Sequence, residues 1–207
     1  MTKRNVFISY HHRNDQEYKN YLLWMNNTYD IFFDRSVRTG DIDENLPPET
    51  IRTKIRDNWL RDSTVTILLC GTETQYRKHV DWELKSSMID GAVNKKSGIL
   101  VIDLPTTSST SWYASYPSEK DIVYSDYEGG WVSYEKKSQY DVAYPEMPKR
   151  IIDNLWNKNA NLSVVQWDKI QNDPEKLRWL IDKTAEGRLG NNYDLSLPMR
   201  MRDYYPD

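Results

Sequence analysis

The chain has a single cysteine and no long apolar run, and each shortage excludes a class of protein. With Cys70 alone, no disulfide can form within the chain, and its place in the apolar run 64–70 predicts a buried small hydrophobic side chain. No apolar stretch approaches the roughly 20 residues that cross a bilayer, and residues 1–5 lead into an apolar run without the apolar region of a signal peptide. We therefore expect a cytoplasmic protein with no membrane partner.

The chain also lacks an excess of charge of either sign. Its 28 Lys and Arg and 31 Asp and Glu are mixed along the sequence, giving a net charge of -3. No basic stripe is present that would neutralise a row of phosphates, so a nucleic acid is not an expected partner.

Common enzyme motifs are missing as well. The sequence has no glycine-rich dinucleotide fingerprint, no phosphate-binding loop that ends in Gly-Lys-Ser/Thr, no His-Glu-x-x-His and no Gly-x-Ser-x-Gly. An oxidoreductase that binds NAD through a Rossmann fingerprint is therefore disfavoured. The three histidines, two of them adjacent (His11 and His12), lack the spacing of a metal site. We expect neither a metal nor a resident cofactor.

What the sequence has in quantity is tyrosine and tryptophan. The 207 residues include 15 Tyr and 8 Trp against 3 Phe. Both side chains join a large apolar surface to one polar group, which suits pockets, partly wet surfaces and interfaces. The length is sufficient for one domain with an elaboration.

The first half alternates strand-like and helix-like patterns. Apolar, β-branched runs predict strands over 5–10, 29–33, 65–70 and 98–103. Helices are predicted between them, beginning near Asn14, near Pro48 and at about residue 78, the last continuing to about residue 90. Strands separated by helices predict an α/β fold with a doubly wound parallel sheet. A polar loop over 34–47 follows the second strand.

The second half has a different character. Residues 105–118 predict a loop, and segments 121–126 and 131–134 predict a β-hairpin whose turn contains Gly129 and Gly130. Helices are expected near 149–156 and from Asp173-Pro174, with an irregular tail from Gly187. We expect residues 1–104 to form the core and residues 105–207 to pack on it within a single domain. The aromatic hairpin suits packing or an interface between copies of the chain.

Topology indicates where a ligand would bind. In an open parallel sheet, ligands bind beyond the carboxyl ends of the strands. Segments 9–12, 34–35 and 71–72 follow the first three predicted strands, and the next helix carries Glu83 in its early turns. Taken alone, Glu83 is more typical of a solvated residue near the positive end of a helix.

Four segments carry a resemblance to a known family. Val-Phe-Ile-Ser-Tyr at 6–10, Tyr-Asp-Ile-Phe-Phe-Asp at 29–34, the strand at 65–71 and His-Val-Asp-Trp-Glu at 79–83 resemble TIR domains in order and spacing. The resemblance covers roughly residues 5–104, and the segment 127–134 is similar to the TIR-like proteins of Thoeris antiphage defence. It implies a flavodoxin-like topology and cleavage of NAD as a substrate. In the Thoeris group it further implies a cyclic ADP-ribose isomer, which diffuses to a separate effector after an unidentified phage trigger.

The resemblance also implies roles for individual residues. Glu83 falls on the catalytic glutamate. The substrate-binding positions are Ser9, Tyr10, His11, Asp34, His79 and Trp82. One departure is that many TIR enzymes have tryptophan four residues before the glutamate, where this chain has His79, while Trp82 adjoins the glutamate. Tyr10, Trp82 and the hairpin tyrosines are candidates for stacking on adenine or nicotinamide.

Three functions remain open on the sequence. The chain is a cyclase that makes a signalling nucleotide, a hydrolase that depletes NAD directly, or a scaffold that acts through TIR contacts. The glutamate argues against the scaffold. Ser9 and Asp34 are equally consistent with capping roles, and His11 is more typical of an exposed loop residue. Because we expect Glu83 to line a surface cleft, the substitution Glu83→Gln should abolish product formation and change the stability by less than about 1 kcal/mol.

Overall fold

The computed structural model describes residues 2–36, 46–92, 94–125 and 129–204. Its centre is a parallel sheet of five strands in the order β2-β1-β3-β4-β5. The strands are β1 (Asn5–Ser9), β2 (Phe33–Asp34), β3 (Val65–Cys70), β4 (Gly98–Asp103) and β5 (Leu162–Gln166). This confirms the predicted doubly wound α/β fold with flavodoxin-like topology. The strand order reverses between β1 and β3.

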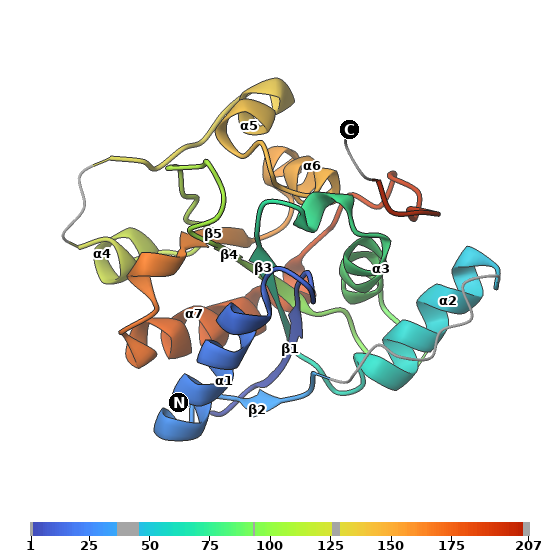
Figure 1. Cartoon of the computed structure of the whole chain (residues 1–207), viewed down its shortest axis with the longest axis horizontal. Helices are drawn as coiled ribbons and strands as arrows, with labels where there is room; N and C mark the ends of the chain where they lie inside the picture. Colours follow the sequence, from blue (N-terminus) through green and yellow to red (C-terminus); the bar gives the residue numbers. More distant parts are fainter. Residues whose placement is uncertain (1, 37–45, 93, 126–128, 205–207) are drawn as a thin grey trace.

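Helices cover both faces of the sheet (Figure 1). The helices are α1 (Gln16–Tyr29), α2 (Pro48–Lys54), α3 (Lys78–Ser87), α4 (Glu119–Val123), α5 (Lys137–Ala143), α6 (Lys149–Asn157) and α7 (Pro174–Gly187). A π-helical turn, Ile55–Trp59, extends α2. Helices α1 and α7 pack on one face, while α2, α3 and α6 pack on the other. None of the helices in the described ranges is long and apolar enough to span a membrane.

Strand β3 shows why the sheet needs a layer of helices on each face. All six of its side chains are buried, as expected for a central strand of a parallel sheet. Val65, Ile67 and Leu69 pack towards α1 and α7, whereas Leu68 and Cys70 pack towards α3 and α6. Cys70 is a buried free thiol, as predicted.

The second strand was predicted too early in the chain. Helix α1 continues to Tyr29, and Asp30 ends it with a left-handed φ of 52°. Strand β2 is therefore limited to Phe33 and Asp34 at the edge of the sheet instead of spanning 29–33. The aromatic residues of 29–33 suggested a strand, but the helical hydrogen bonds of α1 continue through the first of them. Residues 37–45 of the predicted loop lie outside the described residues.

The predicted β-hairpin is wrong. Residues 119–123 form helix α4, and Trp131 forms a bridge with Trp112 instead of with a strand at 121–126. The Trp112 ring stacks on Tyr124 with centroids 3.5 Å apart, so Tyr124 packs inwards, whereas Trp131 is 41% exposed. Residues 126–128 of the predicted turn lie outside the described residues.

The C-terminal half also supplies part of the sheet. Strand β5 was not predicted, yet it pairs with β4 from Ile99 to Asp103. The helices predicted near 149–156 and from Asp173 are confirmed as α6 and α7, and the Asp173 side chain caps α7.

Candidate active site

A pocket of about 400 Å³ lies at the point where the strand order reverses. This volume falls within the range of roughly 300–1,000 Å³ typical of ligand pockets. Its walls come from the segment after β1, the segment after β3, the first turns of α3 and the C-terminal tail. The lining residues are Tyr10, His11, His12, Arg13, Glu73, Arg77, His79, Val80, Glu83 and Asp203.

A buried carboxyl group joins the two loops that form the pocket. Asp15 is 1% exposed, and its Oδ2 accepts a hydrogen bond of 3.2 Å from the Thr74 hydroxyl. Burial raises the pKa of Asp15 to about 6. Gly71 permits this contact, because a Cβ atom there would lie 2.4 Å from Oδ1 of Asp15. The loop after β1 and the loop after β3 are thereby held in one arrangement.

Glu83 is buried at one wall of the pocket. Val80 and Leu84 of α3, with Met88 at its C-terminal end, form a buried stripe, and Glu83 stands at its margin near the carboxyl edge of the sheet. The side chain is 4% exposed, and its Oε2 accepts a hydrogen bond of 2.6 Å from the Ser9 hydroxyl. Burial raises the pKa of Glu83 to about 7, while the Ser9 hydrogen bond and the positive charge of Lys19 act in the opposite direction.

An aromatic pair forms another part of the lining. The rings of Tyr10 and His12 are stacked with centroids 4.4 Å apart, and Tyr10 donates a hydrogen bond of 2.7 Å to Gln16. Nζ of Lys19 lies 5.1 Å from the centroid of the Tyr10 ring. Burial, with Lys19 and His79, lowers the pKa of His12 and favours a neutral imidazole. Since His12 is exposed, the pair presents a flat ring at the pocket.

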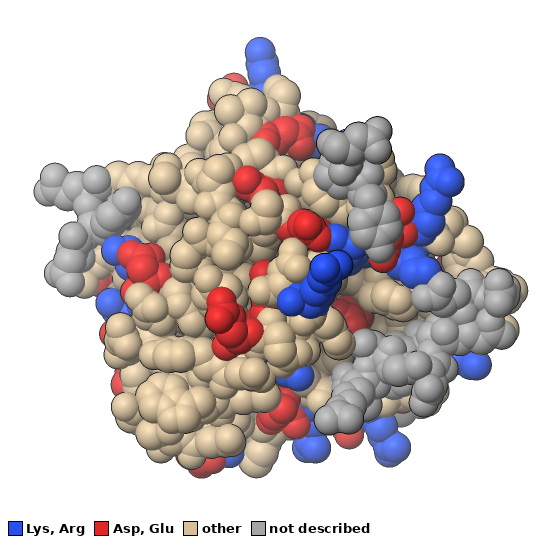
Figure 2. All heavy atoms as spheres, in the orientation of Figure 1, with Lys and Arg blue, Asp and Glu red and all other residues tan. Residues whose placement is uncertain are grey.

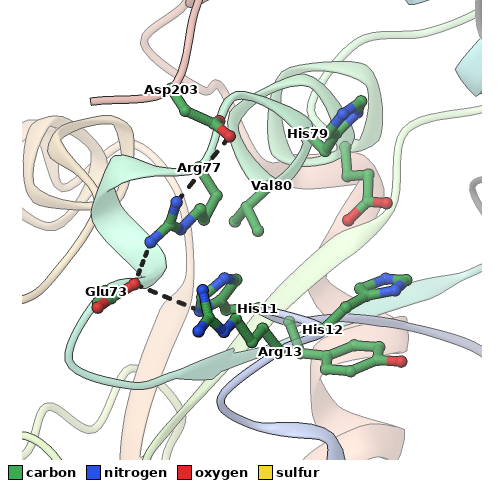
Figure 3. Close-up of a pocket in the computed structure, with 10 residues that line it drawn as sticks. His11, His12, Arg13, Glu73, Arg77, His79, Val80 and Asp203 are labelled. Atoms are coloured by element: carbon green, nitrogen blue, oxygen red, sulfur yellow. Dashed lines mark hydrogen bonds and ion pairs between the residues drawn. The ribbon is translucent and has the colours of Figure 1, made fainter. Parts of the chain in front are cut away.

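A chain of ion pairs runs along one wall, from Glu73 through Arg77 to Asp203, and the His11 imidazole lies beside Glu73 (Figure 3). Arg77 pairs with Glu73, and its Nη1 lies 3.9 Å from Oδ2 of Asp203. Nδ1 of His11 lies 3.9 Å from Oε2 of Glu73. Burial and the nearby Arg77 lower the pKa of His11, so its imidazole is neutral at pH 7.

The structure brings most of the predicted site residues together. Tyr10, His11, His79 and Glu83 line the pocket, and Ser9, fully buried, touches it through Glu83. Ser9 is thus placed to orient the carboxyl group.

Two predicted residues lie elsewhere. Asp34 is exposed at the end of β2 and accepts a hydrogen bond of 2.8 Å from the backbone of Ser36. Trp82 is buried in the cluster with Phe7 and Ile51, and its indole donates a hydrogen bond of 2.6 Å to the carbonyl of Arg200. Neither side chain lines the pocket in the described part of the chain.

Sequence reasoning missed several lining residues. Arg13 lines the pocket and forms no ion pair among the described residues. It directly follows His11 and His12, so its position in the sequence could have identified it. Glu73 and Arg77 lie on the loop that precedes the helix of Glu83. Asp203 lies 120 residues beyond Glu83, and no local pattern marks it.

The charge around the pocket is mixed. Figure 2 shows acidic and basic side chains interspersed over the face viewed, as the sequence suggested. The lining contains two arginines and three carboxyl groups. Within the described residues, no group of three or more His, Cys, Asp or Glu is arranged to hold a metal ion. The arrangement suits an uncharged or cationic group beside Glu83, with an anionic group near Arg13.

The doubly wound sheet, with a pocket that contains Glu83 at its switch point, defines an α/β domain of flavodoxin-like topology. Residues 7–109 match the family described as Thoeris protein ThsB, TIR-like domain, and the chain belongs to this family. The matched segment begins in β1, extends just past β4 and includes every lining residue except Asp203. No curated protein matches the chain.

Proposed function

We propose that the chain is an enzyme that cleaves the nicotinamide–ribose bond of NAD beside Glu83 and releases a cyclic ADP-ribose-type signalling nucleotide. The observation that carries the proposal is a buried carboxyl group that lines a pocket at the switch point and is oriented by Ser9. Membership of the Thoeris ThsB family supports a place in antiphage defence. The nucleotide would act in the cytoplasm on a separate effector, after a phage trigger of unknown identity.

Cleavage of the nicotinamide–ribose bond requires an ionised carboxylate and no general acid. Nicotinamide is already cationic in NAD, so it leaves with the electron pair of the glycosidic bond and needs no proton. The ribose carbon then acquires oxocarbenium character, as in glycoside hydrolysis. The Glu83 carboxylate stabilises this positive charge and orients the ribose hydroxyls, and low local polarity strengthens both effects.

The cationic substrate itself favours the active form of Glu83. Its pKa of about 7 leaves a substantial carboxylate fraction at neutral pH. A positive nicotinamide ribose nearby lowers the pKa of the carboxyl group, since an opposite charge stabilises the ionised form. Arg13 is available for the pyrophosphate, and the Tyr10–His12 pair is available for a planar base.

The fate of the ribose cation distinguishes a cyclase from a hydrolase. In cyclisation, a nucleophile of the same molecule attacks the ribose carbon and gives up a proton, and no water is added. In hydrolysis, water attacks and linear ADP-ribose forms. Cyclisation therefore depends on keeping water from the cation. The aromatic lining favours exclusion of water.

The test is incubation of the purified chain with NAD, followed by separation of products by mass. A product equal to NAD minus nicotinamide supports the cyclase, and a product heavier by one water supports the hydrolase. Unchanged NAD, both alone and in lysate from phage-infected cells, would support a scaffold that acts through contacts between TIR domains. Glu83→Gln is the negative control and should form neither product.

A further inference from the structure

The C-terminal segment Leu197–Tyr204, which we term the C-terminal strap, lies along α3 (Figure 1). Three side chains of α3 hold its backbone. Lys85 donates a hydrogen bond to the carbonyl of Leu197, Trp82 donates to the carbonyl of Arg200, and Asp81 accepts from the backbone N–H of Arg200. Contacts at three positions of one helix place the strap in a defined register.

The end of the strap reaches the pocket. Oδ1 of Asp203 accepts a hydrogen bond of 2.7 Å from the backbone N–H of Lys78, the first residue of α3. Oδ2 of the same carboxyl group faces Arg77, as Figure 3 shows. The next residue, Tyr204, donates its backbone N–H to the carbonyl of Tyr76 at 3.1 Å. Asp203 therefore lines the pocket and also accepts a hydrogen bond from the N-terminus of α3.

Helix α3 depends on this contact because its own N-cap position cannot provide it. That position is Arg77, and an arginine side chain has no acceptor for the free N–H groups of a first turn. A carboxylate supplied from elsewhere performs the role that Asp or Ser usually performs locally. It also suits the positive end of the helix.

The first turns of α3 carry three of the pocket residues. His79 and Val80 lie in the first turn, and Glu83 follows one turn later. Fraying of the first turn would displace His79 and Val80, and with them part of the pocket lining beside Glu83. Small displacements of such walls have large effects on turnover, since reacting groups must be held in a narrow range of geometry.

We propose that Asp203 is a positioning residue for the proposed NAD-cleaving reaction and that the C-terminal strap completes the active site. The inference rests on the proposed function for its reaction and on the observed contacts for its mechanism. The hydrogen bond to Lys78 is the operative contact. The ion pair with Arg77 spans 3.9 Å on a partly exposed surface, where such pairs contribute little.

The experiment compares Asp203→Ala and Asp203→Asn in the full chain. Asparagine keeps the Oδ1 acceptor and removes the charge, so it separates the two contacts. We expect Asp203→Ala to lower kcat/KM for NAD by about ten-fold or more. We expect kcat/KM of Asp203→Asn to lie within about three-fold of the original value, since Asn caps helices as well as Asp does.

The matched control is Asp173→Ala. Asp173 caps α7 through a hydrogen bond of 3.0 Å to the backbone N–H of Lys176, away from the pocket. Its loss should lower the thermal stability to a similar extent and leave kcat/KM unchanged. Equal losses of turnover in both alanine variants would overturn a positioning role, as would an Asp203→Asn variant as impaired as Asp203→Ala.

Amide hydrogen exchange provides a second measurement that does not depend on activity. The amides of Lys78 and His79 should exchange about five-fold or more faster in Asp203→Ala, with those of α7 unchanged. Unchanged exchange at these amides would overturn the inference. If the original chain and Glu83→Gln are equally inert towards NAD, the proposed function fails, and exchange still decides whether Asp203 orders α3.

Discussion

Replacement of Glu83 by glutamine should stabilise the protein at neutral and alkaline pH while abolishing turnover. The pKa of Glu83 is raised from 4.5 to about 7 because the carboxyl group is buried. At about 1.4 kcal/mol per pKa unit, ionising it costs about 3 kcal/mol more in the folded protein than in the unfolded chain. Glutamine has the same shape and can accept the Ser9 hydrogen bond, but it carries no charge to bury.

The direction of the pH dependence follows from the number of protons that the folded and unfolded states bind. Below about pH 4.5 the carboxyl group is protonated in both states, and the two proteins should be nearly equal in stability. As pH rises from 4.5 to 7, the unfolded chain releases its proton while the folded protein retains it, so the original protein loses stability relative to the variant. Well above pH 7 the difference is constant, at up to about 3 kcal/mol, or roughly 6–12 °C in Tm.

The assay is thermal or urea unfolding of both proteins between pH 4.5 and 8.5. Glu119→Gln is the matched control, because Glu119 is also buried and its pKa is also raised to about 7, but it lies on α4 away from the pocket. It should gain stability in the same pH window and keep full turnover. A difference between Glu83→Gln and the original protein that does not change with pH would refute the reasoning. Burial thus corrects the expectation of a nearly neutral substitution.

Three further predictions concern the same site. NAD turnover should rise with pH through about 7 as Glu83 ionises, and a kcat/KM profile that is flat from pH 6 to 8 would contradict this. Ser9→Ala removes a hydrogen bond that lowers the pKa of Glu83, so the midpoint of that profile should move to higher pH; a shift to lower pH would count against the assigned role. Gly71→Ala places a Cβ atom against Asp15 and should cost about 1–3 kcal/mol in urea unfolding, whereas an unchanged midpoint would show that the loops adapt.

The sequence was most informative where local pattern and tertiary structure agree. Strands β3 and β4 occur at the predicted residues because continuous β-branched runs suit strands that are buried on both faces. Glu83 could be placed because it lies in the early turns of a helix that begins where it was predicted, at Lys78. Ser9 and His11 followed from the rule that ligands bind at the carboxyl ends of parallel strands.

Prediction failed where distant contacts decide the structure. Strand β5 has only five residues, and its strand character depends on pairing with β4 across about 60 residues. Trp82 was assigned to the substrate, but it packs against Met199 of the tail instead. Asp203 shows the same limit, since its role depends on the fold that brings the tail to α3.

The position of β5 in the chain has a consequence for biosynthesis. When the ribosome has released residues 7–109, β4 has emerged but its outer neighbour, residues 162–166, has not yet been made. During that interval β4 is an unpaired edge, with Ile99 and Val101 awaiting their cover from α6 and β5. Unpaired apolar edges attract other chains, so association with other chains is most favoured during this interval. An isolated 7–109 fragment would remain in this exposed state permanently.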